Sequence, residues 1–155
     1  MISKKWQVEL LSILFIAGIC ALILVPVYFQ AGSLYKFYIQ NVISIFAFFS
    51  FTKYIFLLEY LPYSRNRWFK FAGIFLAIPI FIYLINSLYD FQRFLDEEGI
   101  ASVLLHTQNM DNYDFGKFIR YQYLLFNTGA LVCTVLLPVR MIVSFWRTYN
   151  TKDQV

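Results

Sequence analysis

The chain has 155 residues, of which 60% are hydrophobic and only 14% are charged, and its formal net charge is +4. Soluble domains carry about a quarter charged residues, so this composition argues against a soluble globular enzyme. The basic residues lie beside hydrophobic segments and form no soluble basic face, which argues against a nucleic-acid partner.

Four stretches of the sequence are long enough and apolar enough to cross a bilayer. They cover residues 10–29, 37–61, 71–89 and 121–146. About 20 apolar residues in a helix span the hydrocarbon core, where only helices and closed barrels satisfy their own backbone hydrogen bonds. We therefore predict an all-α integral membrane protein, in which residues 1–155 form one domain folded as a four-helix bundle.

The distribution of lysine and arginine predicts the orientation of this bundle. Basic residues are concentrated in the two terminal segments and in the connection between the second and third spans, whereas most acids lie in residues 90–120. Short cytoplasmic loops are enriched in Lys and Arg, so we predict cytoplasmic termini and an extracytoplasmic loop at 90–120. Richness in Phe, Tyr, Ile, Asn and Lys is typical of AT-rich bacterial genomes, which favours the inner membrane of a bacterium.

The connection formed by residues 90–120 is the longest segment outside the predicted spans, and we expect it to be structured. Its first nine residues place aromatic and charged side chains on opposite faces of a helix. This spacing predicts a short amphipathic helix on the outer membrane surface that ends at Gly99. The candidate interaction residues of this surface are Phe91, Phe94, Asp96, Glu97 and Glu98.

Lys53 is the most unusual residue inside a predicted span. It lies about 13 Å from the end of its span at Pro62, deep in a core that is about 30 Å thick. Its own helix has no carboxylate three or four residues away. We expect its partner on another helix, on another subunit or in a cavity water. It is then either a proton- or ion-coupled site, or an ammonium held by helix carbonyls or by an acid of a partner protein.

Other ionisable residues lie in the cytoplasmic half of the predicted bundle. These are Glu9, Glu59 and Arg140, and each is close enough to the interface to reach toward the headgroups. Contact between the first and fourth helices would pair Glu9 with Arg140.

Polar residues also form a stripe along the second span. Its members are Asn41, Ser44, Thr52 and Glu59. Polar groups in lipid seek hydrogen-bond partners, so this stripe is expected to face protein. Residues at a similar outer depth on the third and fourth spans would form a polar layer: Asn86, Ser87, Asn127 and Thr128.

The sequence offers no recognisable metal or cofactor site. Cys20 and Cys133 lie in the middle of two spans, without a CxxC motif, and are expected to pack as small apolar residues. The one histidine, His106, lies near Asp111 and Asp114 at a spacing that matches no ligand framework. We therefore predict no bound metal, no cofactor and no catalytic residues.

Three functions remain open, and the first is our leading hypothesis. The chain would be a non-catalytic subunit or accessory protein of a larger inner-membrane complex, packed in the lipid bilayer against other integral membrane proteins. The second function is a sensory or ligand-binding module that uses the outer loop. The third is a homo-oligomeric ion or proton conductor in which Lys53 lines the path.

Overall fold

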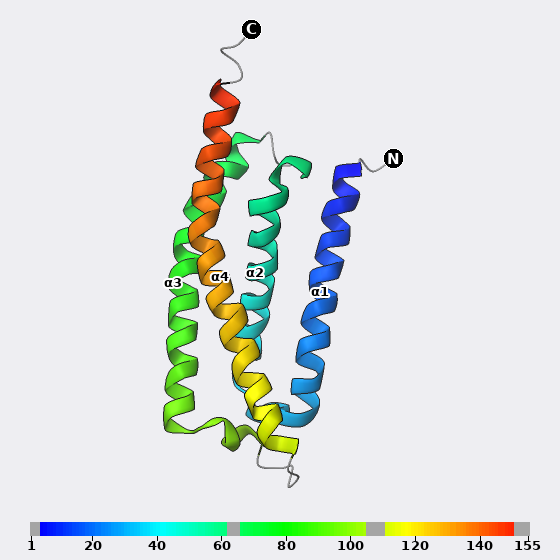
Figure 1. The fold of residues 1–155 in the computed structure, drawn as a ribbon, viewed down its shortest axis with the longest axis vertical. Helices are drawn as coiled ribbons and strands as arrows, with labels where there is room; N and C mark the ends of the chain where they lie inside the picture. Colours follow the sequence, from blue (N-terminus) through cyan, green and yellow to red (C-terminus); the bar gives the residue numbers. More distant parts are fainter. Residues whose placement is uncertain (1–3, 62–65, 105–110, 151–155) are drawn as a thin grey trace.

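The computed structural model describes residues 4–61, 66–104 and 111–150, and within these ranges the regular structure is entirely helical (Figure 1). The long helices are α1 (Lys4–Ala31), α2 (Tyr38–Leu57), α3 (Arg67–Glu97) and α4 (Asp111–Asn150). Short 3₁₀ segments are η1 (Gly32–Leu34), η2 (Leu58–Tyr60) and η4 (Ile100–Leu104). Each long helix is long and apolar enough to cross a membrane, which confirms the all-α bundle of four candidate membrane helices.

The bundle has an uneven arrangement of its four helices. α4 packs along both α2 and α3, whereas α1 packs mainly along α2 (Figure 1). We call the end where α1 begins and α4 finishes the terminal end, and the other the distal end. The end of α2 and the start of α3 also lie at the terminal end. Because α1 has one principal neighbour, its attachment depends on a small number of contacts.

Aromatic side chains fill the core at the distal end and explain the length of α3. The ring of Phe37 lies 5.3 Å from that of Phe91 and 5.2 Å from that of Phe94, between centroids. Phe91 also stacks on Tyr123 of α4 at 3.9 Å and is 0% exposed. The sequence predicted a span ending at residue 89 and a separate helix on the outer surface. Instead, α3 is continuous to Glu97, because this continuation buries Phe91 and Phe94 inside the bundle.

The fourth helix is also longer than the predicted span 121–146. Its first turns and the η4 segment together cover the distal core, where Leu104 and Ile119 are buried. The expected outer connection, residues 90–120, is therefore helical over most of its described length, while residues 105–110 lie outside the description. The burial of apolar residues on both sides of the connection accounts for this extension.

Helices α2 and α4 approach each other closely at Gly129. A Cβ atom at this position would lie 2.8 Å from two ring carbons of Phe48 on α2. Phe48 is itself packed against Phe49 and Phe126, with ring centroids 5.1 and 5.9 Å away. The absence of a side chain at Gly129 therefore allows the two helices to pack at this distance.

We predict that Gly129→Ala destabilises the protein by about 1–3 kcal/mol, because the added methyl group forces Phe48 out of its packing. Reversible unfolding in mixed micelles measures the change. The matched control is Gly18→Ala on α1, where the added atom meets nothing within 4 Å. There the higher helix propensity of alanine makes the change neutral or slightly stabilising. Equal effects at the two positions would contradict this account.

Candidate functional site

A buried ion pair joins α1 to α2 in the terminal half of the bundle. Lys53 Nζ donates a hydrogen bond to Glu9 Oε1 at 2.8 Å and a second to Ser12 Oγ at 3.1 Å. Tyr54 donates from its hydroxyl to the same Glu9 oxygen at 3.1 Å. The Lys53 and Glu9 side chains are only 8% and 9% exposed. Lys53 thus finds its partner on another helix of its own chain, the first of the three sources considered from the sequence.

Local spacing on each helix brings these groups together. Glu9 and Ser12 are three residues apart, so they share one face of α1. The Ser12 hydroxyl donates to the Glu9 carbonyl at 2.7 Å, which leaves its oxygen directed at Lys53. On α2, the Lys53 ammonium lies 4.7 Å from the centroid of the Tyr54 ring, at cation–π distance. The ammonium is therefore surrounded by a carboxylate, a hydroxyl and an aromatic face.

The pair expected between Glu9 and Arg140 is not formed, because α1 packs along α2 and Glu9 is engaged there by Lys53. Arg140 on α4 instead donates from Nε to the carbonyl oxygen of Ile55 at 2.9 Å. This bond joins α4 to the last turn of α2, where carbonyl groups lack partners within the helix. The side chain of Glu59 lies outside the described side chains.

The polar stripe of α2 faces the interior of the bundle, as expected, on a side of α2 away from α1. Asn41 and Ser44 are fully buried, and Ser44 Oγ accepts a hydrogen bond from Asn127 Nδ2 at 3.1 Å. Farther along α2, Thr52 Oγ1 donates to the Phe48 carbonyl at 2.7 Å and lies 3.4 Å from Cys133 Sγ. Ser44 and Thr52 are therefore directed toward α4, whereas Asn41 donates to the Tyr35 hydroxyl. Lys53 is directed toward α1.

Only half of the expected outer polar layer lies inside the bundle. Ser87 Oγ is 2.6 Å from the Tyr123 hydroxyl and 3.4 Å from Asn127 Nδ2, so these residues form one hydrogen-bonded cluster. Asn86 and Thr128 are exposed on the outside of their helices. The carboxamide oxygen of the buried Asn127 has no hydrogen-bond partner among the described residues.

The candidate interaction residues of the outer loop fall into a buried group and an exposed group. Phe91 and Phe94 belong to the distal core, while the acidic residues are exposed. Glu97 accepts from Arg93 Nε at 2.7 Å, and Glu98 lies 3.3 Å from Lys36 Nζ. Asp96 is also exposed. His106 lies outside the described residues, and the described part of the chain contains no group of three or more potential metal ligands.

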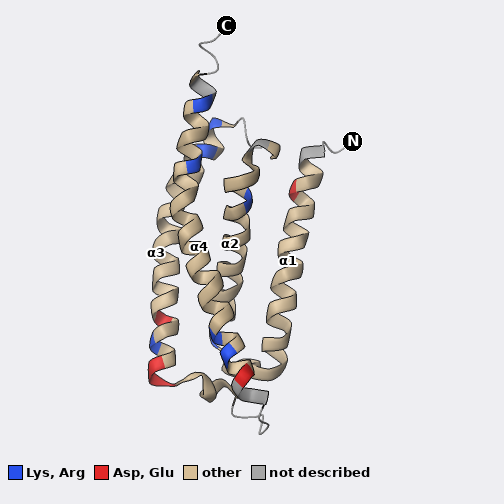
Figure 2. Cartoon of the chain, viewed as in Figure 1, with Lys and Arg blue, Asp and Glu red and all other residues tan. Residues whose placement is uncertain are grey.

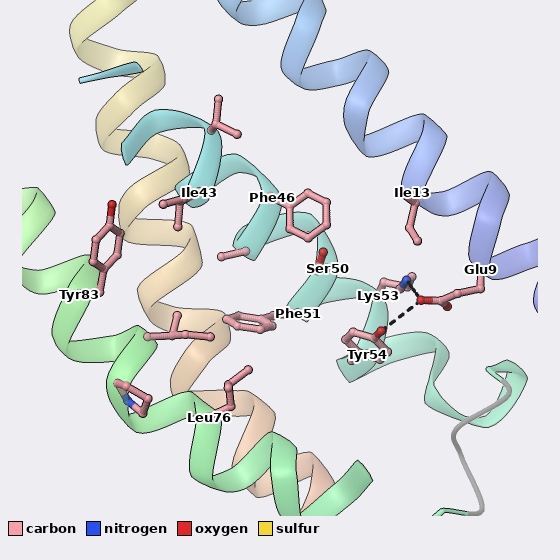
Figure 3. Close-up of a pocket in the computed structure, with 14 residues that line it drawn as sticks. Glu9, Ile13, Ile43, Phe46, Ser50, Phe51, Lys53, Tyr54, Leu76 and Tyr83 are labelled. Atoms are coloured by element: carbon pink, nitrogen blue, oxygen red, sulfur yellow. Dashed lines mark hydrogen bonds and ion pairs between the residues drawn. The ribbon is translucent and has the colours of Figure 1, made fainter. Parts of the chain in front are cut away.

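A lateral groove opens between α1, α2 and α3, next to the ion pair (Figure 3). Its volume is about 720 Å³, and α2 forms its floor. The Glu9–Lys53 pair and Tyr54 lie at one end of the groove, and Tyr83 of α3 lies at the other (Figure 3). The remaining lining residues are largely apolar: Ile13, Val42, Ile43, Phe46, Ala47, Ser50, Phe51, Leu76, Pro79 and Ile80.

Sequence reasoning did not find this groove. Its lining comes from three helices, and its width depends on how far α1 stands from α3 on the surface of α2. Residues such as Phe46 and Leu76 look like ordinary lipid-facing positions in the sequence. The only available signal was Lys53, which marks one end of the groove.

No family model, curated protein or solved structure matches the chain.

We predict that replacing one member of the ion pair, as in Lys53→Met, destabilises the attachment of α1 by about 3–5 kcal/mol, because it leaves the Glu9 carboxylate buried and unpaired. The double variant Glu9→Met with Lys53→Met should regain most of this loss. Reversible unfolding in mixed micelles, read as a double-mutant cycle, measures both effects.

The matched control is Lys36→Met, which removes the exposed partner of Glu98. Exposed pairs contribute about 0–1 kcal/mol, so this variant should change little. A Lys53→Met protein as stable as the Lys36→Met protein would show that the buried pair does not hold α1.

Proposed function

We propose that the protein is a non-catalytic accessory subunit of a larger assembly in a bacterial inner membrane, and that the groove is its docking surface. The observation that carries this proposal is the groove itself, a concave apolar surface formed jointly by three helices. Membrane helices associate through close packing and interhelical hydrogen bonds, and a groove offers more contact area to a partner helix than a convex face.

The pairing of Lys53 with Glu9 changes the reason to expect a partner protein. An unpaired lysine deep in the membrane would have required an acid from another protein, but Glu9 already supplies that acid. The reason to expect a partner therefore moves from the charge of Lys53 to the shape of the groove beside it. Small residues on the groove floor, such as Ala47 and Ser50, favour close approach of a second helix.

The two rival functions receive less support. A conductor would need Lys53 and the polar stripe of α2 on one path, but Lys53 is directed to α1 and Ser44 is bonded to Asn127 of α4. A receptor surface on the outer loop would use Phe91 and Phe94, whose side chains are already part of the distal core. We therefore favour lateral docking over both.

We further propose that the terminal end of the bundle lies in the cytoplasm. Among the described side chains, acids gather at the distal end with the exception of Glu9, while basic residues occur at both ends (Figure 2). Exposed tryptophans Trp68 and Trp146 near the terminal end are typical of a membrane interface. A cysteine introduced at Asn150 should resist an impermeant maleimide added to intact cells and react after lysis. Labelling in intact cells would contradict this orientation.

Co-purification from native membranes tests the docking proposal. The tagged chain, expressed at its native level and extracted in a gentle detergent, should elute with a stoichiometric integral membrane partner. Leu76→Trp, which fills the groove, should abolish that co-elution because the added ring occupies the space of the partner.

The matched control is Val132→Trp, an exposed position on α4 that does not line the groove. It should leave the partner bound. Elution of the unmodified protein without any partner would contradict the proposal, as would a partner retained equally by both tryptophan variants.

A further inference from the structure

Ser50 on α2 carries a hydroxyl group that makes no hydrogen bond within the described part of the chain. Buried hydroxyls elsewhere in the membrane helices bond back to their own helix, as Ser44 does to Gln40 and Thr134 does to Ala130. Ser50 forms no such bond, although only 8% of the residue is exposed. A hydroxyl without a partner in apolar surroundings is unfavourable, because it has lost its bonds to water.

The groove gives access to this hydroxyl. Ser50 is one of the residues that line it, and Figure 3 shows its oxygen beside the ring of Phe46. The unbonded oxygen of the ion pair, Glu9 Oε2, is fully enclosed by the protein, whereas Ser50 Oγ keeps accessible surface. Ser50 can therefore bond to an occupant of the groove without any rearrangement of the ion pair.

The surroundings of Ser50 define the rest of the occupant. The groove walls are apolar, with Ile13 on α1 and Leu76 on α3. Ala47 precedes Ser50 by three residues and also lines the groove, so two small side chains lie one above the other on its floor. Small residues let the backbone of a second helix come close. The groove therefore fits an apolar body with one polar group at the level of Ser50.

The depth of Ser50 decides between lipid and protein as the occupant. Ser50 lies seven residues before Leu57, the last residue of α2, so it is about 10 Å along the helix from the terminal end. An acyl chain reaches this depth but has no hydrogen-bonding group, and the polar groups of a phospholipid stay at the bilayer surface. A transmembrane helix brings a polar side chain to this depth on an apolar body.

A second copy of this chain is poorly suited to supply that side chain from α4. Phe48 of α2 lies against Gly129 of α4, so the part of α4 level with Ser50 follows Gly129, and its exposed side chain there is Val132. The exposed polar residue nearest this level on α4 is Thr128, about one turn away. Its hydroxyl already donates to a carbonyl of its own helix at 2.6 Å.

We infer that the groove receives a transmembrane helix of a different protein, which carries one hydrogen-bonding side chain at the level of Ser50 and apolar side chains on the rest of its contact face. Ser, Thr, Asn or Gln at that position bonds to the Ser50 hydroxyl. This inference rests on the proposed docking function and defines the chemistry of the partner helix.

Cross-linking from the groove identifies the occupant. A photo-reactive amino acid replaces Phe46, which is 45% exposed in the groove one turn from Ser50, and native membranes are irradiated. Mass spectrometry should map a transmembrane segment of another protein with Ser, Thr, Asn or Gln within one turn of the cross-linked residue. A photo-reactive residue at Val132 is the control and should not capture this segment. Cross-links from residue 46 to lipid alone, to a second copy, or to a segment that is apolar throughout this turn would overturn the inference.

A synthetic peptide of the mapped segment then measures the hydrogen bond in lipid vesicles. Ser50→Ala should bind the peptide about three- to ten-fold more weakly than the unmodified protein does. Alanine in place of the polar residue of the peptide should weaken binding equally, and the two changes together should weaken it no further. Because Ser50 bonds to no described residue, Ser50→Ala should unfold like the unmodified protein.

The control for this measurement is Thr128→Ala on the exposed face of α4, which should leave peptide affinity unchanged. Full affinity of Ser50→Ala for the peptide, or losses from the two alanine changes that simply add, would overturn this inference but leave the docking proposal intact. The absence of any cross-linked or co-purified partner would overturn both.

Discussion

The ion pair between Glu9 and Lys53 is the constraint on which the arrangement of α1 depends. Two charged groups this far inside an apolar bundle are stable only when they bond to each other and to further polar groups. Ser12 and Tyr54 supply those further bonds. Since α1 has one principal neighbour, this pair fixes its rotation and its depth against α2. The position of α1 in turn sets the width of the groove.

Different physical means hold the two halves of α1 in the bundle. At the distal end, apolar and aromatic side chains from every long helix pack into one cluster, which includes Val27 of α1 and Tyr123 of α4. In the terminal half, α1 is held by the polar contacts of Glu9 and Ser12. The first kind of contact is non-directional and the second is directional. Together they fix α1 at two levels, and the groove lies between α1 and α3 on the open side of α2.

Hydrophobic length was sufficient to predict the class of fold, because a run of about 20 apolar residues has few alternatives to a membrane helix. Length could not predict where α3 ends. Phe91 and Phe94 alternate with charged residues as they would in a surface helix, and only the position of Phe37 and Tyr123 shows that they are buried. The sequence singled out Lys53 as a charge inside an apolar helix, but its partner depended on which helix lies beside α2. The Glu9–Arg140 pair was expected only if α1 lay against α4, and α1 packs along α2 instead.

The contact between Lys53 and Glu9 can be measured directly in a bilayer. Solid-state NMR on protein with ¹⁵N-labelled lysine and ¹³C-labelled glutamate reports a dipolar coupling between a side-chain nitrogen and a carboxyl carbon only at short range. The structure predicts a coupling that Glu9→Gln and Lys53→Met each remove, consistent with the 2.8 Å contact. A protein that is folded in the bilayer and shows no such coupling would contradict the placement of α1, and with it the groove.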